Sequence, residues 1–141
     1  MIDFGAILSA LHILPVLVAA VAGFVFGAIY YMTFGKAWMA ALGTTAEEIR
    51  GNKSMVPFIT AFVAQVVMAT MLYGIIHHIG EMTVRRGMIS ATFIWIGFVI
   101  TTMAVNHGFQ GSKRMLTLID GAHWLGVLLI QGAVIGFLGG D

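Results

Sequence analysis

Two ionisable side chains, Asp120 and His123, stand three residues apart in a mostly apolar stretch. On an α-helix this spacing places both on one face, where a carboxylate can orient an imidazole or the pair can pass a proton. Charged groups are costly inside a membrane, so ionisable residues there are functional candidates by default. The pair is therefore a candidate proton- or substrate-responsive site.

The same pair has two other interpretations. A metal site would need at least one more ligand, which His107 can supply. A structural interpretation places Asp120 in the first turn of its helix, where its carboxylate caps free amides and is stabilised by the helix dipole. The sequence leaves all three interpretations open.

Other polar residues extend the candidate polar site. Asn106 and His107 are expected at the same depth as Asp120, together with Tyr31 at the end of the first apolar segment. Gln65 and Gln131 each lie inside an apolar segment. In a transporter or channel, Asp120, His123 and Asn106 would form a gate or proton-coupled site, and Gln65 and Gln131 would line the path.

Three histidines are expected near the opposite membrane surface. His12, His77 and His78 raise the possibility of a haem held between two helices. His77 and His78 are adjacent and point about 100° apart, so at most one can face the centre of a bundle. We predict no cofactor, and keep haem or metal binding as a further hypothesis.

Composition places the chain in a membrane. Of its 141 residues, 60% are hydrophobic and 9% charged, against about 25% charged residues in soluble domains. A net charge of +1 offers no basic field for nucleic acid, which excludes nucleic-acid binding as a primary role. The absence of cysteine excludes disulfides, thiolate metal sites and cysteine nucleophiles.

Four segments are long enough to cross a bilayer, which takes about 20 apolar residues. We place them at about 13–34, 55–78, 88–107 and 116–139, with the first helix starting near Pro15, a residue that suits a first turn. The prediction is an all-α integral membrane four-helix bundle that forms a single domain over residues 1–141. The lipid bilayer is its first partner.

The connection over residues 35–54 is expected to be amphipathic and to hold two short interfacial helices. One would cover residues 36–42, with Phe34, Gly35 and Trp38 in the headgroup region. The other would start at a capping box formed by Thr45 and Glu48. Connections 35–54 and 108–115 together hold five of the seven basic residues, which predicts that both are cytoplasmic and that both termini face outward.

A weak repeat relates the two halves of the chain. Residues 23–25 (Gly-Phe-Val) recur at 97–99, and each half carries one glutamine in its second helix. This pattern is consistent with two tandem helical hairpins.

Small residues at every fourth position predict close helix packing, within the bundle or between protomers. They form one ladder in the first segment and one in the fourth: Ala19, Gly23, Gly27, Gly132, Gly136 and Gly140. On the fourth segment the glycine face lies about 140 to 160° from the polar face.

The stretch from Tyr30 to Gly43 resembles the end of the first helix in the bacterial domain-of-unknown-function family 1761. Residues 106–109 and the Ile119-Asp120 pair with His123 are similar to that family's later segments. The resemblance implies a small four-span protein of the bacterial inner membrane. It implies no activity.

No catalytic motif of soluble enzymes is present, so we expect no enzyme. The leading hypothesis is an oligomerising or accessory subunit of a membrane complex, with copies of itself or other membrane subunits as partners. The alternative is a small transporter or channel with a responsive site near Asp120, His123 and Asn106. A haem- or metal-binding protein is the third hypothesis.

Overall fold

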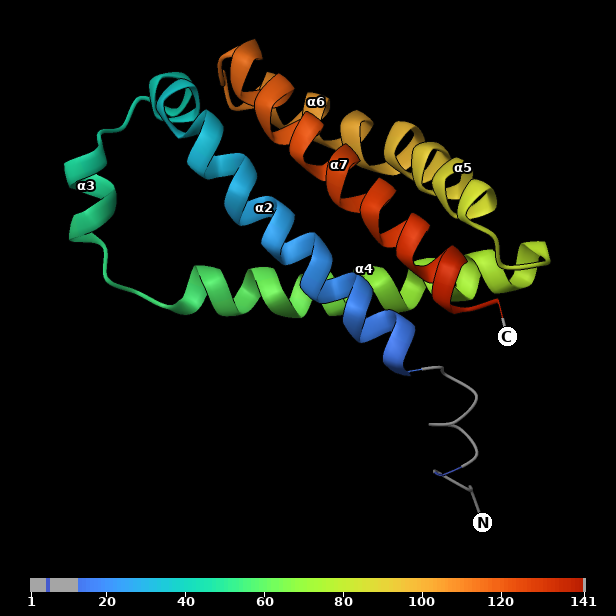
Figure 1. The fold of residues 1–141 in the computed structure, drawn as a ribbon. Coiled ribbons are helices and arrows are strands. Elements are labelled where there is room, and N and C mark those ends of the chain that lie inside the picture. Colours follow the sequence, from blue (N-terminus) through green and yellow to red (C-terminus); the bar gives the residue numbers. More distant parts are fainter. Residues whose placement is uncertain (1–4, 6–12, 141) are drawn as a thin grey trace.

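The computed structural model describes residue 5 and residues 13–140 (Figure 1). Its elements are α2 (Ile13–Leu42), α3 (Ala46–Gly51), α4 (Val56–Ile79), α5 (Val84–Ile94), the π-helical turn η1 (Trp95–Val99), α6 (Ile100–Phe109) and α7 (Arg114–Leu138). Four helical segments, 13–42, 56–79, 84–109 and 114–138, are long and apolar enough to cross a membrane. The predicted all-α, four-span fold class is confirmed.

The first helix is longer than predicted. Pro15 lies in the first turn of α2, where its missing N–H is not needed, and the helix then continues through Gly35 to Leu42. A mid-helix glycine costs only about 1 kcal/mol relative to alanine, too little to end a helix. The end comes at Gly43, whose φ of 81° is a typical helix C-terminus. The prediction of a separate interfacial helix over residues 36–42 is therefore wrong.

The second predicted short helix exists as α3, with a modified cap. The backbone N–H of Glu48 donates to the Thr45 hydroxyl (3.2 Å), which is half of the predicted capping box. The Glu48 carboxylate instead accepts from the hydroxyl of Thr44 (2.8 Å). The helix start is thus stabilised by two adjacent threonines.

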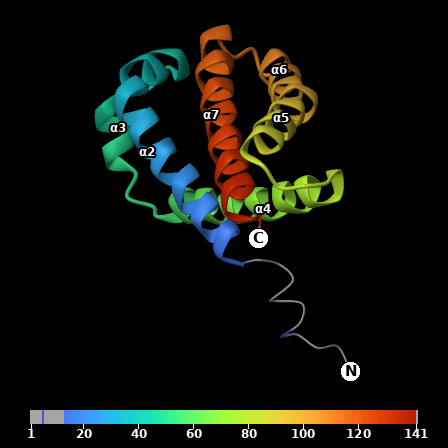
Figure 2. The same cartoon turned by 45° about the vertical axis from the view of Figure 1, so that its right-hand side comes forward.

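Helix α7 is the centre of the fold. Figure 2 shows it between α2 on one side and α5 and α6 on the other, with α4 crossing below them. In its most apolar stretch 44% of residues are buried, against 11–28% in the other three segments. Side chains on α7 therefore have protein neighbours on several sides.

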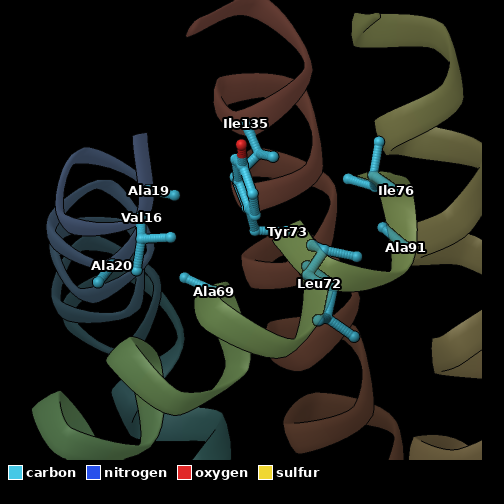
Figure 3. Close-up of a cluster of buried hydrophobic side chains, with 10 residues drawn as sticks. Val16, Ala19, Ala20, Ala69, Leu72, Tyr73, Ile76, Ala91 and Ile135 are labelled. Carbon is cyan, nitrogen blue, oxygen red and sulfur yellow. The ribbon is translucent and has the colours of Figure 1, made fainter. Parts of the chain in front are cut away.

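The main apolar core lies where α2, α4 and α7 meet (Figure 3). Ala19 and Ala20 of α2 are fully buried, as is Ala69 of α4, and Ile135 of α7 fills the space beside them. Small residues let the helix backbones come close, which is how helices gain contact in lipid. Many large apolar side chains point outward instead, as expected for a lipid-facing surface.

Helices α5 and α7 pack through glycine. A Cβ added at Gly132 would overlap the carbonyl of Gly87, and one added at Gly136 would overlap the carbonyl of Thr83. Gly140 is looser, since its added Cβ would lie 3.1 Å from the carbonyl oxygen of Met82. The glycine ladder of the fourth segment therefore packs within the chain.

The π-helical turn η1 changes which face of the third segment meets α7. A π turn adds one residue, so the helix phase shifts by about 100°. Trp95 donates from Nε1 to the carbonyl of Gly121 (2.8 Å), and Ile100 continues that inward face against Gly121. Uninterrupted α-helical spacing would have put Thr102 and Asn106 there, and both are exposed.

Candidate functional site

Asp120 of α7 is hydrogen-bonded to a tyrosine of α2. The Tyr31 hydroxyl donates to Asp120 Oδ1 at 2.6 Å, and both side chains are partly buried. Because α7 begins at Arg114, Asp120 lies in the second helical turn. The interpretation of Asp120 as a first-turn cap is therefore wrong. Within residues 13–140 the carboxylate forms no ion pair with a basic side chain, which leaves the phenol as its stabilising partner.

Tyr30 and Tyr31 attach the end of α2 to α7 at neighbouring points. The Tyr30 hydroxyl donates to the backbone carbonyl of Ile119 at 2.7 Å. Since the bond from Tyr31 ends on a carboxylate, it is the stronger of the two. The pair positions the α2 backbone beside the polar face of α7.

His123 is enclosed by aromatic rings. Its side chain is 5% exposed, and its ring lies 4.8 Å from that of Tyr31 and 4.6 Å from that of Trp124. A Cβ added at Gly27 would lie 2.8 Å from His123 Nε2, so glycine is needed opposite the imidazole. His123 Nδ1 is buried and has no hydrogen-bond partner among residues 13–140.

Asp120 and His123 are linked through Tyr31. The tyrosine hydroxyl contacts the carboxylate while its ring contacts the imidazole. The i, i+3 spacing does place both α7 residues toward α2, and the third member of the cluster comes from α2 itself. Phenol, carboxylate and imidazole can each hold or release a proton.

The two glutamines meet in the middle of the fold. Gln131 Nε2 donates to Gln65 Oε1 (2.6 Å) and to the backbone carbonyl of Gln65 (3.2 Å). Gln131 Oε1 is buried, and no group in the described part of the chain donates a hydrogen bond to it. A Cβ at Gly23 would collide with the Gln65 amide, so this member of the α2 ladder makes room for the polar pair. The two positions aligned by the repeat are thus in direct contact.

Two predicted members of the site lie elsewhere. Asn106 is exposed on α6, because the phase shift at η1 turns it away from α7. His107 points inward instead, and its Nδ1 lies 2.8 Å from the Thr117 hydroxyl. His107 therefore meets the start of α7, while His123 meets α2. His107 and His123 therefore do not come together to form the proposed metal site.

The histidines at the other end of the bundle are surface residues. His77 and His78 are exposed, their ring centroids are 6.1 Å apart, and His77 stacks on Tyr73. His12 lies outside the described residues. Over residues 13–140 no group of three His, Asp or Glu side chains is placed to hold a metal ion.

The predicted interfacial residues belong to the last turns of α2. Trp38 is half-buried against the ring of Tyr31, 5.8 Å between centroids, and Phe34 packs on Tyr30. Gly35 has no atom within 4 Å of an added Cβ. Lys113 Nζ donates to the carbonyl of Ala40 (3.2 Å), so the connections before α4 and before α7 lie at the same end of the bundle.

A cleft of about 350 Å³ opens beside this cluster, between α2, α4 and α7. Its walls are largely aromatic, and polar side chains line part of it: Phe24, Gly27, Ala28, Tyr31, Phe58, Ala61, Gln65, His123 and Trp124. Figure 1 shows α4 diverging from α2 toward the N-terminal end of α4, and Phe58 near that end lines the cleft. His123 and Gln65 thus face a space large enough for a small molecule.

The sequence analysis did not predict that α4 forms one wall of the cleft, or that α5 packs on the glycine ladder of α7. Phe58 gives no signal, because an aromatic residue in a membrane helix looks the same whether it faces lipid or a cleft. Gly87 had a signal: Gly87 and Ala91 form a small residue pair at a spacing of four. That pair meets Gly132.

Residues 14–136 match the family model described as protein of unknown function (DUF1761). A search of curated proteins and a search of solved structures returned no match. The match covers the four apolar segments and includes Tyr31, Gln65, Asp120, His123 and Gln131. The chain is therefore a member of the DUF1761 family, built as a four-span membrane protein.

Proposed function

We propose that this protein is a small membrane transporter or channel that carries protons along the polar face of α7. The observation that carries the proposal is the hydrogen bond from Tyr31 to Asp120, a carboxylate in a membrane segment with no cation beside it. Ionisable groups are costly inside a membrane, so a carboxylate in a membrane segment is a functional candidate by default.

Asp120 begins a row of polar side chains rather than standing alone. His123 and Gln131 follow it on α7, and the row ends where Gln131 meets Gln65 of α4. From Asp120 to Gln131 the helix rises about 16 Å. This distance is about half of a hydrocarbon core about 30 Å thick.

The part of α2 that faces these polar side chains consists of small residues. Gly27 faces the imidazole of His123, and Gly23 faces the two glutamines. Tyr31 at one end can both donate and accept a proton, as can an imidazole. These features favour proton transfer between side chains on facing helices.

The glycine ladders no longer favour the subunit hypothesis. Gly132 and Gly136 pack on the backbone of the chain before and within α5, while Gly23 and Gly27 pack on polar side chains of the same chain. The surfaces that suggested contact between protomers are therefore occupied inside one protomer. Proton transport is the function for which the remaining polar groups provide a reason.

The test is proton uptake by proteoliposomes that contain a trapped pH dye and carry a potassium diffusion potential. We expect the wild-type protein to acidify the lumen faster than protein-free vesicles, and Asp120→Asn to reduce the rate to that of protein-free vesicles. Asparagine keeps an acceptor for Tyr31 but cannot hold the proton. Glu48→Gln makes the same chemical change in the connection, where the carboxylate is exposed, and should keep the wild-type rate.

Two results would overturn the proposal. One is a wild-type rate equal to that of protein-free vesicles. The other is an Asp120→Asn rate equal to the wild-type rate at the same amount of folded protein.

A further inference from the structure

The cleft between α2, α4 and α7 has a chemistry of its own. Its wall includes the rings of Tyr31, Phe58 and Trp124, and no Asp, Glu, Lys or Arg lines it. Aromatic faces favour flat apolar bodies, which stack or pack edge to face against them. Without a lining carboxylate or ammonium group, the cleft has no fixed charge to balance a charged ligand.

Two polar side chains face this apolar space. His123 lines the cleft, and its Nε2 lies opposite Gly27, which lines the cleft as well. Gln65 also lines it, and its Oε1 is already occupied by Gln131. The Gln65 amide nitrogen is a donor, and the imidazole donates from Nε2 in the tautomer that carries its proton there. A carbonyl oxygen in the cleft could accept from both side chains.

The rim indicates where such a partner comes from. Phe58 is 59% exposed on α4, a segment long and apolar enough to span the membrane. A molecule that enters past this side chain enters from lipid. It must therefore be lipophilic.

We infer that the cleft binds an uncharged, lipophilic ring compound that presents a carbonyl oxygen to His123 and Gln65. The ring stacks between the aromatic walls, and the oxygen accepts hydrogen bonds from the His123 imidazole and the Gln65 amide. A volume of about 350 Å³ accommodates one bicyclic ring system. This binding does not depend on proton movement, so the inference and the proposed function can fail separately.

The experiment titrates the purified full-length protein in detergent with 2-methyl-1,4-naphthoquinone and follows tryptophan fluorescence. Trp124 lines the cleft, so binding should produce saturable quenching above the linear collisional background. The matched probe is 2-methylnaphthalene, which has the same ring system without carbonyl groups. We expect it to bind at least tenfold more weakly, because it cannot accept the two hydrogen bonds.

Two variants locate the site. Ala28→Leu fills the cleft and should abolish saturable quenching, while Ala37→Leu, at another exposed alanine of α2, should leave it unchanged. His123→Phe keeps a ring among the aromatic residues but removes the donor, and should weaken quinone binding at least tenfold. Its folded state can be checked independently by circular dichroism.

Three outcomes would overturn the inference. Wild-type protein with no saturable quenching would mean that the cleft takes only detergent or lipid chains. Equal binding of the two probes would mean that no carbonyl is recognised. Unchanged quinone binding by both Ala28→Leu and His123→Phe would place the ligand elsewhere.

Discussion

The two sides of α7 are packed by different means. Toward α5, glycine backbones touch, as at Gly132 and Gly87, and no side chain separates them. Toward α2 and α4, an apolar core that includes Ile135 is joined by hydrogen bonds from Tyr31 to Asp120 and from Gln131 to Gln65, beside an open cleft. One helix thus has a closed packing face and a polar face with free volume.

The difference shows how a short chain can combine stability with a costly polar site. Close backbone contact in lipid supplies packing without polar groups. Buried polar groups with unmet hydrogen bonds, such as His123 Nδ1 and Gln131 Oε1, subtract from stability. We therefore interpret the α5 side as serving packing alone, and the α2 and α4 side as combining the apolar core with the polar groups that do chemistry.

The largest effect is expected on the packing side. Gly132→Ala places a methyl group against the carbonyl of Gly87, and backbone cannot rotate out of its way. In a dodecyl sulfate titration the free energy of unfolding should fall by about 3 kcal/mol, which is the upper part of the range for overpacked cores. Gly74→Ala is the control, because an added Cβ there has no neighbour within 4 Å. Equal stability of the two variants would refute tight α5–α7 packing.

A smaller loss is expected at the Asp120 hydrogen bond. Tyr31→Phe removes a bond to a carboxylate and should cost about 2 kcal/mol, whereas Tyr30→Phe removes a bond to a backbone carbonyl and should cost about 1 kcal/mol. The two substitutions remove the same hydroxyl from neighbouring residues of α2, so each serves as the control for the other. If Tyr30→Phe were the more damaging change in the same titration, the carboxylate would not be the main anchor of α2.

The glutamine pair should show a measurable coupling. Gln65→Met and Gln131→Met, alone and together, form a double-mutant cycle in which methionine preserves side-chain length. Coupling energies for such bonds in membranes average about 0.6 kcal/mol and reach about 1.7 kcal/mol. We expect a value in this range, because Gln131 donates twice to Gln65. A coupling energy of zero would mean that the two amides act independently.

The smallest effect on stability is expected at His123. His123→Phe removes an unpaired buried nitrogen and retains the ring contacts with Phe26 and Tyr31. The free energy of unfolding should stay the same or rise by up to about 1 kcal/mol. A clear loss of stability would show that the imidazole has a structural partner and would weaken its assignment to a functional face.

Much of this architecture could be predicted from the sequence. The lengths of the apolar segments predicted the four spans. The helical spacing predicted that Asp120, His123 and Gln131 lie on a different face of α7 from Gly132 and Gly136. These inferences succeed because α7 is regular from Arg114 to Leu138, so a constant angle per residue holds along it.

The errors arise where the helix is irregular or where helices cross. Asn106 was misplaced because the π turn at Trp95–Val99 leaves no mark in hydropathy. The extension of α2 past Gly35 was missed because a glycine between helical residues does not show by itself whether it continues or ends a helix. The cleft depends on the angle at which α4 crosses α2, and that angle is set by tertiary packing.

The central claim is that packing and proton movement belong to opposite sides of α7. The most direct test is the rate of proton uptake per folded molecule, measured side by side in vesicles with Gly132→Ala and with Asp120→Asn. The account predicts that Gly132→Ala keeps the wild-type rate per folded molecule and that Asp120→Asn reduces it to the rate of protein-free vesicles. Proton uptake at the wild-type rate in Asp120→Asn would contradict this account. So would uptake at the rate of protein-free vesicles in correctly folded Gly132→Ala.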